Sequence, residues 1–542
     1  MRMPTIHRRF RHRALLWAVA ASLALTATSG APAGADSPAP GLSQTLDHIL
    51  SDTRLDGAQV GVVVSDAETG QTLYQRNGGG RLVPASSTKL LTSTAAMALL
   101  GPDYRYSTDV LADGSRHGSV VQGDLYLRGT GDPTMLAEDY DRLAATVAAS
   151  GIRRITGRLV ADDTRFDSSR LGASWASDDE SAYYSSQISP LTVAPDTDYD
   201  AGTVLLSVTP GSAPGDAPRV KVTPSNDYVH IDNRATTVAA GGSRTITVDR
   251  THGSNTIVVS GKIPVESTPA TSWTSVWEPT GYAAAVFADA LAAHGVKVTR
   301  GTVLGKAVPQ GASTLASHPS MPLKDLLTPF LKLSNNNHAE VLVKTIGYEV
   351  KGSGTWSAGL SAISDHLRTL GLDPSDLRQM DGSGLSRMDV VSTEQFTELL
   401  VAARHQPWFE EWYDALPIAC VSDRMTGGTL RSRMCGTSAA GNLHGKTGSL
   451  TGVSGLSGYV TDADGRKLVF SFVSNNYVAS SVKDIEDAVG AALAGYSVKG
   501  AQQPQGTGTA RSDRPSTDAP TARDEHSGRT DLECSWTKPV SC

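Results

Sequence analysis

Apolar residues recur at helical spacing directly after Ser86 and Lys89, in the segment LLTSTAAMALLG, which ends at a Gly-Pro pair. This spacing predicts a helix that begins near Ser86. Ser86 and Lys89 are three residues apart, so a helix points both side chains the same way. On this stretch alone, the ordinary interpretation is a serine that caps the helix and a solvated lysine.

Other apolar patterns predict a mixture of helices and strands on either side of a long central region. AQVGVVVSDAETGQTLYQRN predicts a hairpin, and GSLTGVSGLSGYVTDADGRKLVFSFVSNN predicts two strands around an Asp-Gly turn. Helical spacing recurs in LSQTLDHILSD, PLKDLLTPFLKLSNNNHAEVLVKTIGYEV, WSAGLSAISDHLRTLG, STEQFTELLVAAR and SSVKDIEDAVGAALAGY. In the fourth of these, Ser392 and Gln395 have the spacing of a capping box. These elements fit one antiparallel sheet flanked by helices.

The central region, 104–312, consists of short β-type runs such as VVQGDLYLRG, RVKVTP and NTIVVSGKIPV, separated by Gly, Asp and Pro. One segment in it, GYAAAVFADALAAHG, has helical spacing. We therefore expect an α+β domain in two parts, 36–103 and 313–499. A mainly β insertion that forms two subdomains, 104–312, interrupts this domain.

The two ends of the chain differ from the folded part. Residues 1–35 have the parts of a signal peptide: the basic stretch MRMPTIHRRFRHR, the short apolar run ALLWAVAASLAL and the small-residue sequence Ala33-Gly34-Ala35. No later stretch contains the about 18 apolar residues that a membrane span needs. The sequence therefore predicts an exported protein, secreted, extracellular or associated with the cell wall, with no transmembrane segment after signal removal. Residues 500–542 are poor in apolar residues and predict a disordered tail.

Charge and cysteine content exclude some functions. The net charge of −7 gives no electrostatic support for a nucleic-acid partner. Cys420 and Cys435 flank a turn-rich segment and predict a local disulfide, and Cys534 and Cys542 lie in the tail, where they are able to pair with each other. Free thiols or mixed pairing are the alternatives. Neither pair has metal-ligand spacing and no H-E-x-x-H motif occurs, so we expect no metal and no cofactor.

Three short motifs give the chain a chemical interpretation. S-x-x-K at 86–89, S-x-N at 334–336 and K-T-G at 446–448 occur in that order, each at a predicted element boundary. Together they are the motif set of the penicillin-recognising serine enzymes. The chain resembles that superfamily from residue 42 to residue 497.

Further sequence features narrow the resemblance. PAS-x-x-K, the long gap before SNN, GTGDPT, DGSGLS and KTGSLTGVSGLSGYV resemble the low-molecular-mass penicillin-binding proteins with large insert domains. That family comprises D-alanyl-D-alanine carboxypeptidases and endopeptidases, actinomycete members included. The resemblance implies a penicillin-binding/β-lactamase-like domain. It also implies that the enzyme hydrolyses the D-Ala-D-Ala bond, or the D-Ala-diaminopimelate cross-link, of peptidoglycan stem peptides, with β-lactam antibiotics as covalent inhibitors.

The chemistry of peptide hydrolysis gives the motif residues roles. A serine hydroxyl becomes a nucleophile when a base takes its proton, so we expect Ser86 to attack and Lys89 to act as the base. A lysine acts as a base when its pKa falls from about 10.4 towards neutrality, which desolvation and a second cation, Lys446, would promote. We expect Ser334 to relay a proton to the leaving amine, and Asn336 to orient Lys89 and bind a substrate amide. The sequence leaves open whether the lysine is the base.

The strand that begins at K-T-G is expected to bind the substrate. The backbone N–H groups of Ser86 and Ser449 would form the oxyanion hole. Thr447 would hold the terminal carboxylate, and Gly448 would let the substrate backbone approach. The resemblance also implies a pocket for a diamino-acid side chain with a zwitterionic end, with the candidate residues Trp175, Asp178, Tyr183, Arg387, Leu450 and Thr451. The alternative is a solvated acidic turn whose aromatic residues pack the insertion against the main domain.

Other functions use some of the same groups. A serine β-lactamase needs an extra base for fast deacylation, and the devices of classes A and C, a Glu four residues before an Asn and a Tyr in the middle motif, are not visible. A secreted esterase is a further enzyme alternative, and a non-catalytic cell-wall-binding module or β-lactam sensor is the non-enzymatic one. His338 and His444 flank the motifs without a placed acidic partner for a triad. Asp132 in GTGDPT predicts a turn, and DGSGLSR predicts a tight loop.

Overall fold

The computed structural model describes residues 40–501. The predicted signal peptide, the tail from residue 502 onward, Cys534 and Cys542 lie outside the described residues. Within the described part of the chain, no helix is both long enough and apolar enough to span a membrane.

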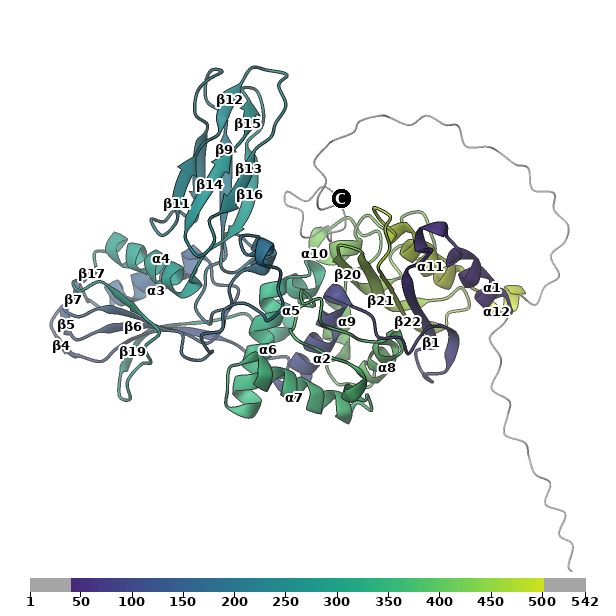
Figure 1. Ribbon diagram of the computed structural model, residues 1–542. Helices are drawn as coiled ribbons and strands as arrows, with labels where there is room; N and C mark the ends of the chain where they lie inside the picture. Colours follow the sequence, from purple (N-terminus) through teal and green to yellow (C-terminus); the bar gives the residue numbers. More distant parts are fainter. Residues whose placement is uncertain (1–39, 502–542) are drawn as a thin grey trace, which may run out of the picture. The chain divides into compact units, whose positions relative to one another are not determined.

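A five-stranded antiparallel sheet forms the centre of the main domain, with the strand order β2-β1-β22-β21-β20. Its strands are β1 (Gln59–Asp66), β2 (Thr72–Arg76), β20 (His444–Leu450), β21 (Val453–Thr461) and β22 (Lys467–Asn475). Strand β1 pairs with β22 from Gln59 opposite Asn475 to Asp66 opposite Leu468. The first and the last strands of the described residues therefore lie side by side (Figure 1), and both predicted hairpins, β1–β2 and β21–β22, are confirmed.

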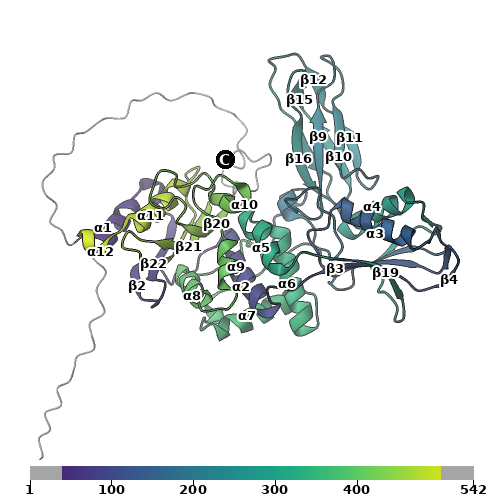
Figure 2. The ribbon, with the colours of Figure 1, turned by 180° about the vertical axis from the view of Figure 1, so that it is seen from behind.

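Both faces of this sheet are buried under helices. Helices α1 (Pro40–Ile49) and α11 (Lys483–Gly495) contact each other on one face, as Figures 1 and 2 show. Helix α8 (Thr393–Ala403) packs on β1 and β22 on the other face. Side chains alternate between the faces: Leu468 and Phe470 join the core under α1 and α11, whereas Val469 joins the core under α8.

Helix α2 (Lys89–Leu99) is buried along most of its length. The helices that contact it are α8 and the further helices α5 (Leu323–Lys332), α6 (Asn336–Lys351), α7 (Trp356–Thr369) and α9 (Phe409–Asp414). Helix α10 (Arg424–Gly427) contacts α5, and α12 (Val498–Ala501) follows α11 along the chain. The predicted capping box is confirmed at the start of α8, where Ser392 and Gln395 exchange hydrogen bonds. Apolar residues of α2, α5, α6 and α8 share one buried cluster, which fixes the position of α2.

The central region forms several small sheets. One group has the strand orders β18-β8-β6-β3-β19 and β17-β7-β5-β4, and the other has β10-β9-β16, β11-β14-β13 and β12-β15. The strands of the first group are β3 (Ser107–Ala112), β4 (Ser115–His117), β5 (Val120–Gln122), β6 (Leu125–Gly129), β7 (Arg154–Ile155), β8 (Leu159–Asp162), β17 (Lys297–Val298), β18 (Thr302–Leu304) and β19 (Ser313–Pro319). Those of the second group are β9 (Thr203–Thr209), β10 (Arg219–Thr223), β11 (His230–Asn233), β12 (Thr236–Val238), β13 (Thr247–Arg250), β14 (Thr256–Ser260), β15 (Lys262–Pro264) and β16 (Ala270–Ser275).

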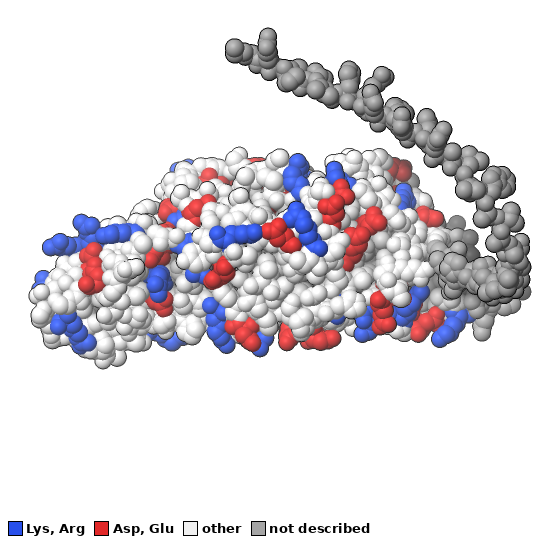
Figure 3. Space-filling model, turned by 90° about the horizontal axis from the view of Figure 1, so that it is seen from below, with Lys and Arg blue, Asp and Glu red and all other residues white. Residues whose placement is uncertain are grey.

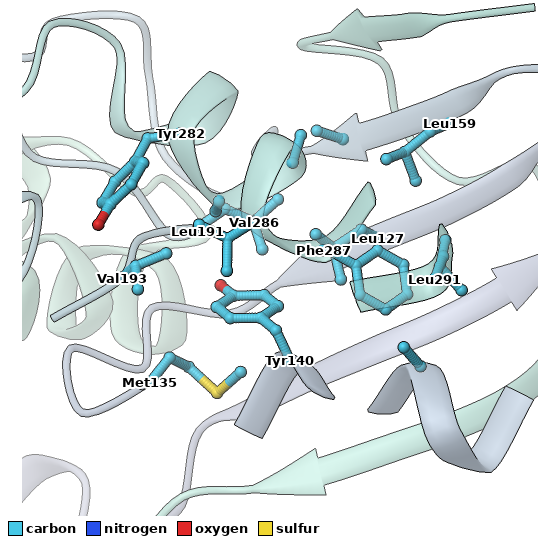
Figure 4. Close-up of a cluster of buried hydrophobic side chains, with 14 of the residues drawn as sticks. Leu127, Met135, Tyr140, Leu159, Leu191, Val193, Tyr282, Val286, Phe287 and Leu291 are labelled. Atoms are coloured by element: carbon cyan, nitrogen blue, oxygen red, sulfur yellow. The ribbon is translucent and has the colours of Figure 1, made fainter. Parts of the chain in front are cut away.

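Two helices pack in this region, not the single one that the sequence predicted. Helix α4 (Pro279–Ala293) matches the predicted segment, and α3 (Ala137–Ala149) is an additional helix that the sequence interpretation missed. Tyr140 of α3 and Phe287 of α4 point into one apolar cluster with Leu127 of β6 (Figure 4). The predicted fold class, an α+β domain with a mainly β insertion, is confirmed.

Charged side chains are mixed in sign on the face that Figure 3 shows. Lys and Arg residues lie next to Asp and Glu residues, so this face carries no continuous basic stripe. Such a stripe is the electrostatic mark of nucleic-acid binding.

Candidate active site

Ser86 and Lys89 lie at the junction of two helices. Ser86 is in the 3-10 helix η2 (Ala85–Thr88), which leads directly into α2 at Lys89. Both side chains are buried, and Lys89 Nζ donates a hydrogen bond to Ser86 Oγ at 2.8 Å. Thr88, not Ser86, occupies the cap position of α2. The ordinary interpretation, a capping serine beside a solvated lysine, is therefore wrong.

Lys89 has two further acceptors from distant parts of the chain. Its Nζ donates to Asn336 Oδ1 at 2.7 Å and to the Ser383 carbonyl at 2.9 Å. Together with Ser86, these acceptors come from three segments of the chain. The side chain is therefore held beside Ser86 in a defined position.

The S-x-N motif lies immediately before and within the first turn of α6. Ser334 has a left-handed backbone with φ of 58°, and the Asn335 side chain caps α6 by accepting from the His338 N–H. Asn336 links two sides of the site, because its Nδ2 donates to the Tyr184 carbonyl at 2.9 Å while its oxygen accepts from Lys89. Ser334 Oγ is buried without a hydrogen-bond partner among the described residues. The hydrogen-bonding capacity of this hydroxyl is therefore unused by the described residues.

The K-T-G motif lies on β20, an edge strand of the main sheet. Lys446 is fully buried and its Nζ donates to the Thr447 carbonyl at 2.8 Å, while Thr447 Oγ1 donates to Thr429 Oγ1 at 2.8 Å. A Cβ at Gly448 would lie 2.5 Å from the Pro84 carbonyl. This glycine therefore lets β20 pass directly against the segment that carries Ser86, a role within the chain that the sequence did not indicate.

The DGSGLS segment forms the predicted tight loop. Gly384 has φ of 81°, and the Asp381 carboxylate accepts from the N–H groups of Gly384 and Ser386, each at 2.7 Å. A Cβ at Gly384 would lie 1.8 Å from the Ala85 carbonyl, so this loop too packs against the segment that carries Ser86.

A buried carboxylate that the sequence analysis missed anchors this loop. Glu340 of α6 is fully buried and accepts from the N–H groups of Gly382 at 2.9 Å and Ser383 at 2.8 Å, and from Trp356 Nε1 at 2.7 Å. Burial, together with the nearby Asp381 carboxylate, raises the pKa of Glu340 to about 7. The one available signal was its position four residues after Asn336, on the same face of the helix.

Most of the residues predicted to bind the substrate side chain come together beside this loop. Trp175 and Tyr183 pack against a small apolar cluster that contains Leu450, and Trp175 Nε1 donates to Asp381 at 2.9 Å. Arg387 Nη2 donates to the Thr451 carbonyl at 2.9 Å. Asp178 is separate: it lies exposed on the 3-10 helix η3 (Ser177–Asp179) and has no hydrogen bond or ion pair to another residue between 40 and 501.

The two histidines beside the motifs have structural surroundings. The Nε2 atom of His338 lies 2.9 Å from the Tyr199 carbonyl, and burial lowers the pKa of His338 to about 4. His444 stacks on Tyr413 with 4.2 Å between the ring centroids. In these contacts the partner of each ring is a backbone carbonyl or an aromatic ring, not the carboxylate that a triad needs. Asp132 forms the predicted turn, since its carboxylate accepts from the Thr134 N–H at 2.8 Å.

The predicted disulfide between Cys420 and Cys435 is confirmed, with 5.0 Å between the Cα atoms. The chain just before Cys420 pairs with the start of β20: Ala419 N–H donates to the Leu443 carbonyl and Gly445 N–H to the Pro417 carbonyl, both at 3.0 Å. The disulfide therefore braces the segment that leads into the strand carrying Lys446.

Comparison with known proteins agrees with this arrangement. Residues 42–496 match the family model of the D-Ala-D-Ala carboxypeptidase 3 (S13) family. A D-alanyl-D-alanine carboxypeptidase of Actinomadura sp. strain R39 is 44% identical over 522 residues, which cover 95% of this chain and 94% of that protein. The carboxypeptidase DacB of Haemophilus influenzae is 26% identical over 433 residues, 80% of this chain and 88% of that protein.

A solved structure shares the fold. The crystal structure of penicillin-binding protein 4 from Haemophilus influenzae superposes with a TM-score of 0.71 at 24% identity, over 83% of this chain and 98% of that one. The family match spans both parts of the main domain and the whole insertion between them. The chain therefore belongs to the D-Ala-D-Ala carboxypeptidase 3 (S13) family and is a serine-type peptidase.

Proposed function

We propose that this protein is an exported DD-peptidase that hydrolyses the D-Ala-D-Ala bond, or the D-Ala-diaminopimelate cross-link, of peptidoglycan stem peptides through an acyl-enzyme on Ser86. The observation that carries the proposal is the buried contact between Lys89 and both Ser86 and Asn336, at 2.8 and 2.7 Å. A serine hydroxyl beside a desolvated lysine is the arrangement that an acylating serine enzyme needs.

In the acylation step, neutral Lys89 takes the proton of Ser86 while Oγ forms a bond to the carbonyl carbon of the penultimate D-alanine. The developing oxyanion accepts hydrogen bonds from the backbone N–H groups of Ser86 and Ser449. The peptide C–N bond then breaks, and the terminal amine leaves with a proton delivered through Ser334. The buried Ser334 hydroxyl, which has no hydrogen-bond partner among the described residues, is consistent with this relay.

In the second step, water attacks the Ser86 ester and releases the shortened peptide, and Lys89 is the candidate base for this water as well. A β-lactam opens its ring on Ser86 in the same way as the substrate. Its leaving nitrogen stays attached to the acyl group, so the ester is long-lived and the enzyme is inhibited.

The substrate is proposed to bind along β20. The free edge of a sheet offers backbone groups to an extended peptide. Lys446 and Thr447 would hold the terminal carboxylate, and Gly448 would let the substrate backbone approach. The side chain of the stem peptide's diamino acid would enter between the aromatic pair Trp175 and Tyr183 and the residues Leu450, Thr451 and Arg387. Asp178, exposed on η3, would then reach the ammonium group from the solvent side.

Labelling with a fluorescent penicillin tests the proposal. Wild-type protein should carry a label that outlasts repeated washing and should release D-alanine from a pentapeptide. Ser86→Ala should show no label while its thermal unfolding profile is unchanged. Labelling of another serine would contradict the assignment. A label lost within seconds would indicate a β-lactamase, and no label on the wild type would indicate a non-catalytic binding protein.

A further inference from the structure

A short loop connects the candidate active site to the inserted β sheets. This loop, residues 176–185, carries Tyr183, which packs in the cluster with Leu450, and Tyr184, whose carbonyl accepts from Asn336 Nδ2 at 2.9 Å. Asn336 in turn contacts Lys89. The position of the 176–185 loop therefore bears both on the side-chain pocket and on the catalytic lysine.

One buried arginine of the insertion, Arg250, forms hydrogen bonds with this loop. Arg250, at the end of β13, has a fully buried side chain, and its Nη2 donates to both the carbonyl and the carboxylate of Glu180, each at 3.0 Å. Its other nitrogens donate to the Ser275 carbonyl at 2.9 Å and the Ser254 carbonyl at 2.8 Å. One guanidinium thus ties Glu180 of the loop to β16 and to the β13–β14 turn.

Glu180 also forms polar contacts with residues other than Arg250. Its carboxylate also accepts from the Gly253 N–H at 3.0 Å and lies 2.9 Å from His252 Nδ1. The backbone of the loop continues the contact, because Ser275 N–H donates to the Ser181 carbonyl at 3.1 Å and Ala182 forms a β-bridge with Thr274 of β16. Residues 180–182 are therefore attached to the edge of the inserted sheet.

A buried guanidinium with this many fixed acceptors costs desolvation energy that an apolar residue would not cost. The planar guanidinium does, however, hold its hydrogen-bond acceptors in fixed positions relative to one another. The loop it fixes has few regular elements: two 3-10 helices, η3 and η4 (Tyr183–Ser185). Without Arg250 this loop would retain the β-bridge and the bonds from Ser275 but would lose its charged anchor.

We propose that Arg250 is a positioning residue for substrate recognition, and that the inserted β region serves through it as the support of the side-chain pocket. This inference rests on the proposed function and adds to it a role for the insertion. Arg250 touches neither the substrate nor Ser86. It acts through Glu180 and the loop, which set the places of Tyr183 and of the Tyr184 carbonyl.

Arg250→Met tests this proposal, because methionine is unbranched and apolar and makes none of the hydrogen bonds of the guanidinium. The control is Arg219→Met, an exposed position on β10 in the same sheet group. Each protein is first titrated with a fluorescent penicillin so that rates are expressed per active site. Two substrates are compared: a stem peptide with a free diamino-acid end and the same peptide N-acylated at that end.

In Arg250→Met, the KM for the peptide with the free diamino-acid end should rise at least fivefold more than the KM for the N-acylated peptide. The rate of penicillin acylation, expressed per titrated active site, should fall about threefold. Arg219→Met should match the wild type. A purely structural role would reduce the number of titrated sites and leave KM and the acylation rate of the remaining sites unchanged, and that result would overturn the proposal. If Arg250→Met does not fold, Glu180→Gln carries the same test, with smaller changes expected in the same direction.

A wild-type protein that neither hydrolyses the peptides nor binds penicillin would refute the proposed function instead. The wild-type assay, done first, therefore separates the two failures.

Discussion

At the scale of single residues, the chemistry depends on how a buried lysine is held. Lys89 reaches acceptors from three separate segments, Ser86, Asn336 and Ser383. Glu340 helps to fix the Ser383 carbonyl, because it binds the backbone N–H groups of Gly382 and Ser383. A residue that forms no hydrogen bond with Ser86 or Lys89 thereby supports one of the acceptors of the candidate base.

Glu340→Gln should lower kcat about tenfold with little change in KM. A glutamine side chain has one acceptor oxygen for three N–H donors, and its own NH₂ would face one of them, which costs about 1.5–3 kcal/mol for a bond to a charged group. The measurement is steady-state hydrolysis of a pentapeptide together with the penicillin acylation rate. Glu411→Gln, an exposed position on α9, is the matched control. A rise in KM at constant kcat would contradict this prediction.

His338 makes the stability of the fold depend on pH. Its pKa lies at about 4 in the folded protein, below the 6.5 of an exposed histidine, so the unfolded chain binds a proton that the folded one does not. Stability that is present above pH 6.5 is therefore lost progressively as the pH falls from 6.5 to about 4. The free energy of unfolding should therefore decrease between pH 7 and pH 4.5 in the wild type. In His338→Gln, which lacks the titrating group, this decrease should be smaller by about 2 kcal/mol.

Urea unfolding at the two pH values measures this difference. The pKa of His444 is also lowered, by burial first and by the Lys332 charge second, but His444 is present in both proteins and cancels in the comparison. Equal losses in the two proteins would show that His338 is not the group that titrates.

At the scale of elements, close backbone contacts assemble the site. The segment with Ser86 has β20 on one side and the DGSGLS loop on another, and each approach depends on a glycine, Gly448 or Gly384, whose missing Cβ leaves room for a carbonyl. The start of β20 is in turn paired with the chain that precedes Cys420. The elements are therefore coupled through the backbone and not only through side chains.

The disulfide should contribute to this coupling. Replacing both cysteines in Cys420→Ala/Cys435→Ala opens a loop with a sequence separation of 15 and should lower the free energy of unfolding by about 3 kcal/mol in the chain-entropy model. Urea unfolding measures the loss, and peptide mapping under non-reducing conditions verifies the bond in the wild type. Free thiols at both positions, or equal stability of the two proteins, would contradict the prediction.

At the scale of the whole molecule, segments that are far apart in the sequence meet at the candidate site. Strands from the two ends of the described chain pair in one sheet. In the region between these strands, Glu180 binds Arg250, and Tyr183 and Tyr184 contact residues of the candidate site. The Arg250 experiment belongs to this scale, because it asks whether a change in the insertion alters recognition in the main domain.

Much of this architecture could be predicted from local patterns. Both hairpins, α8 with its capping box and the Cys420–Cys435 pair followed from spacing, because periodicity and turn residues act over a few positions. Local pattern was less reliable for α3, whose buried residues have helical spacing but lie among short β runs. The exact start of the helix near Ser86 also differed, since the first turn is a 3-10 helix.

The sequence by itself determined the family resemblance, the fold class and the residue types that acylation requires, because motifs and periodicity are properties of the chain alone. Only the tertiary structure decided which groups surround Lys89. Glu340 and Tyr184 belong to no motif, and DGSGLS by itself gave Ser383 no role. These residues matter because folding places their oxygens within hydrogen-bond distance of groups in the site. Arg250 is the extreme case: 70 residues separate it from Glu180, and the partners that satisfy its buried charge come together only in the folded molecule.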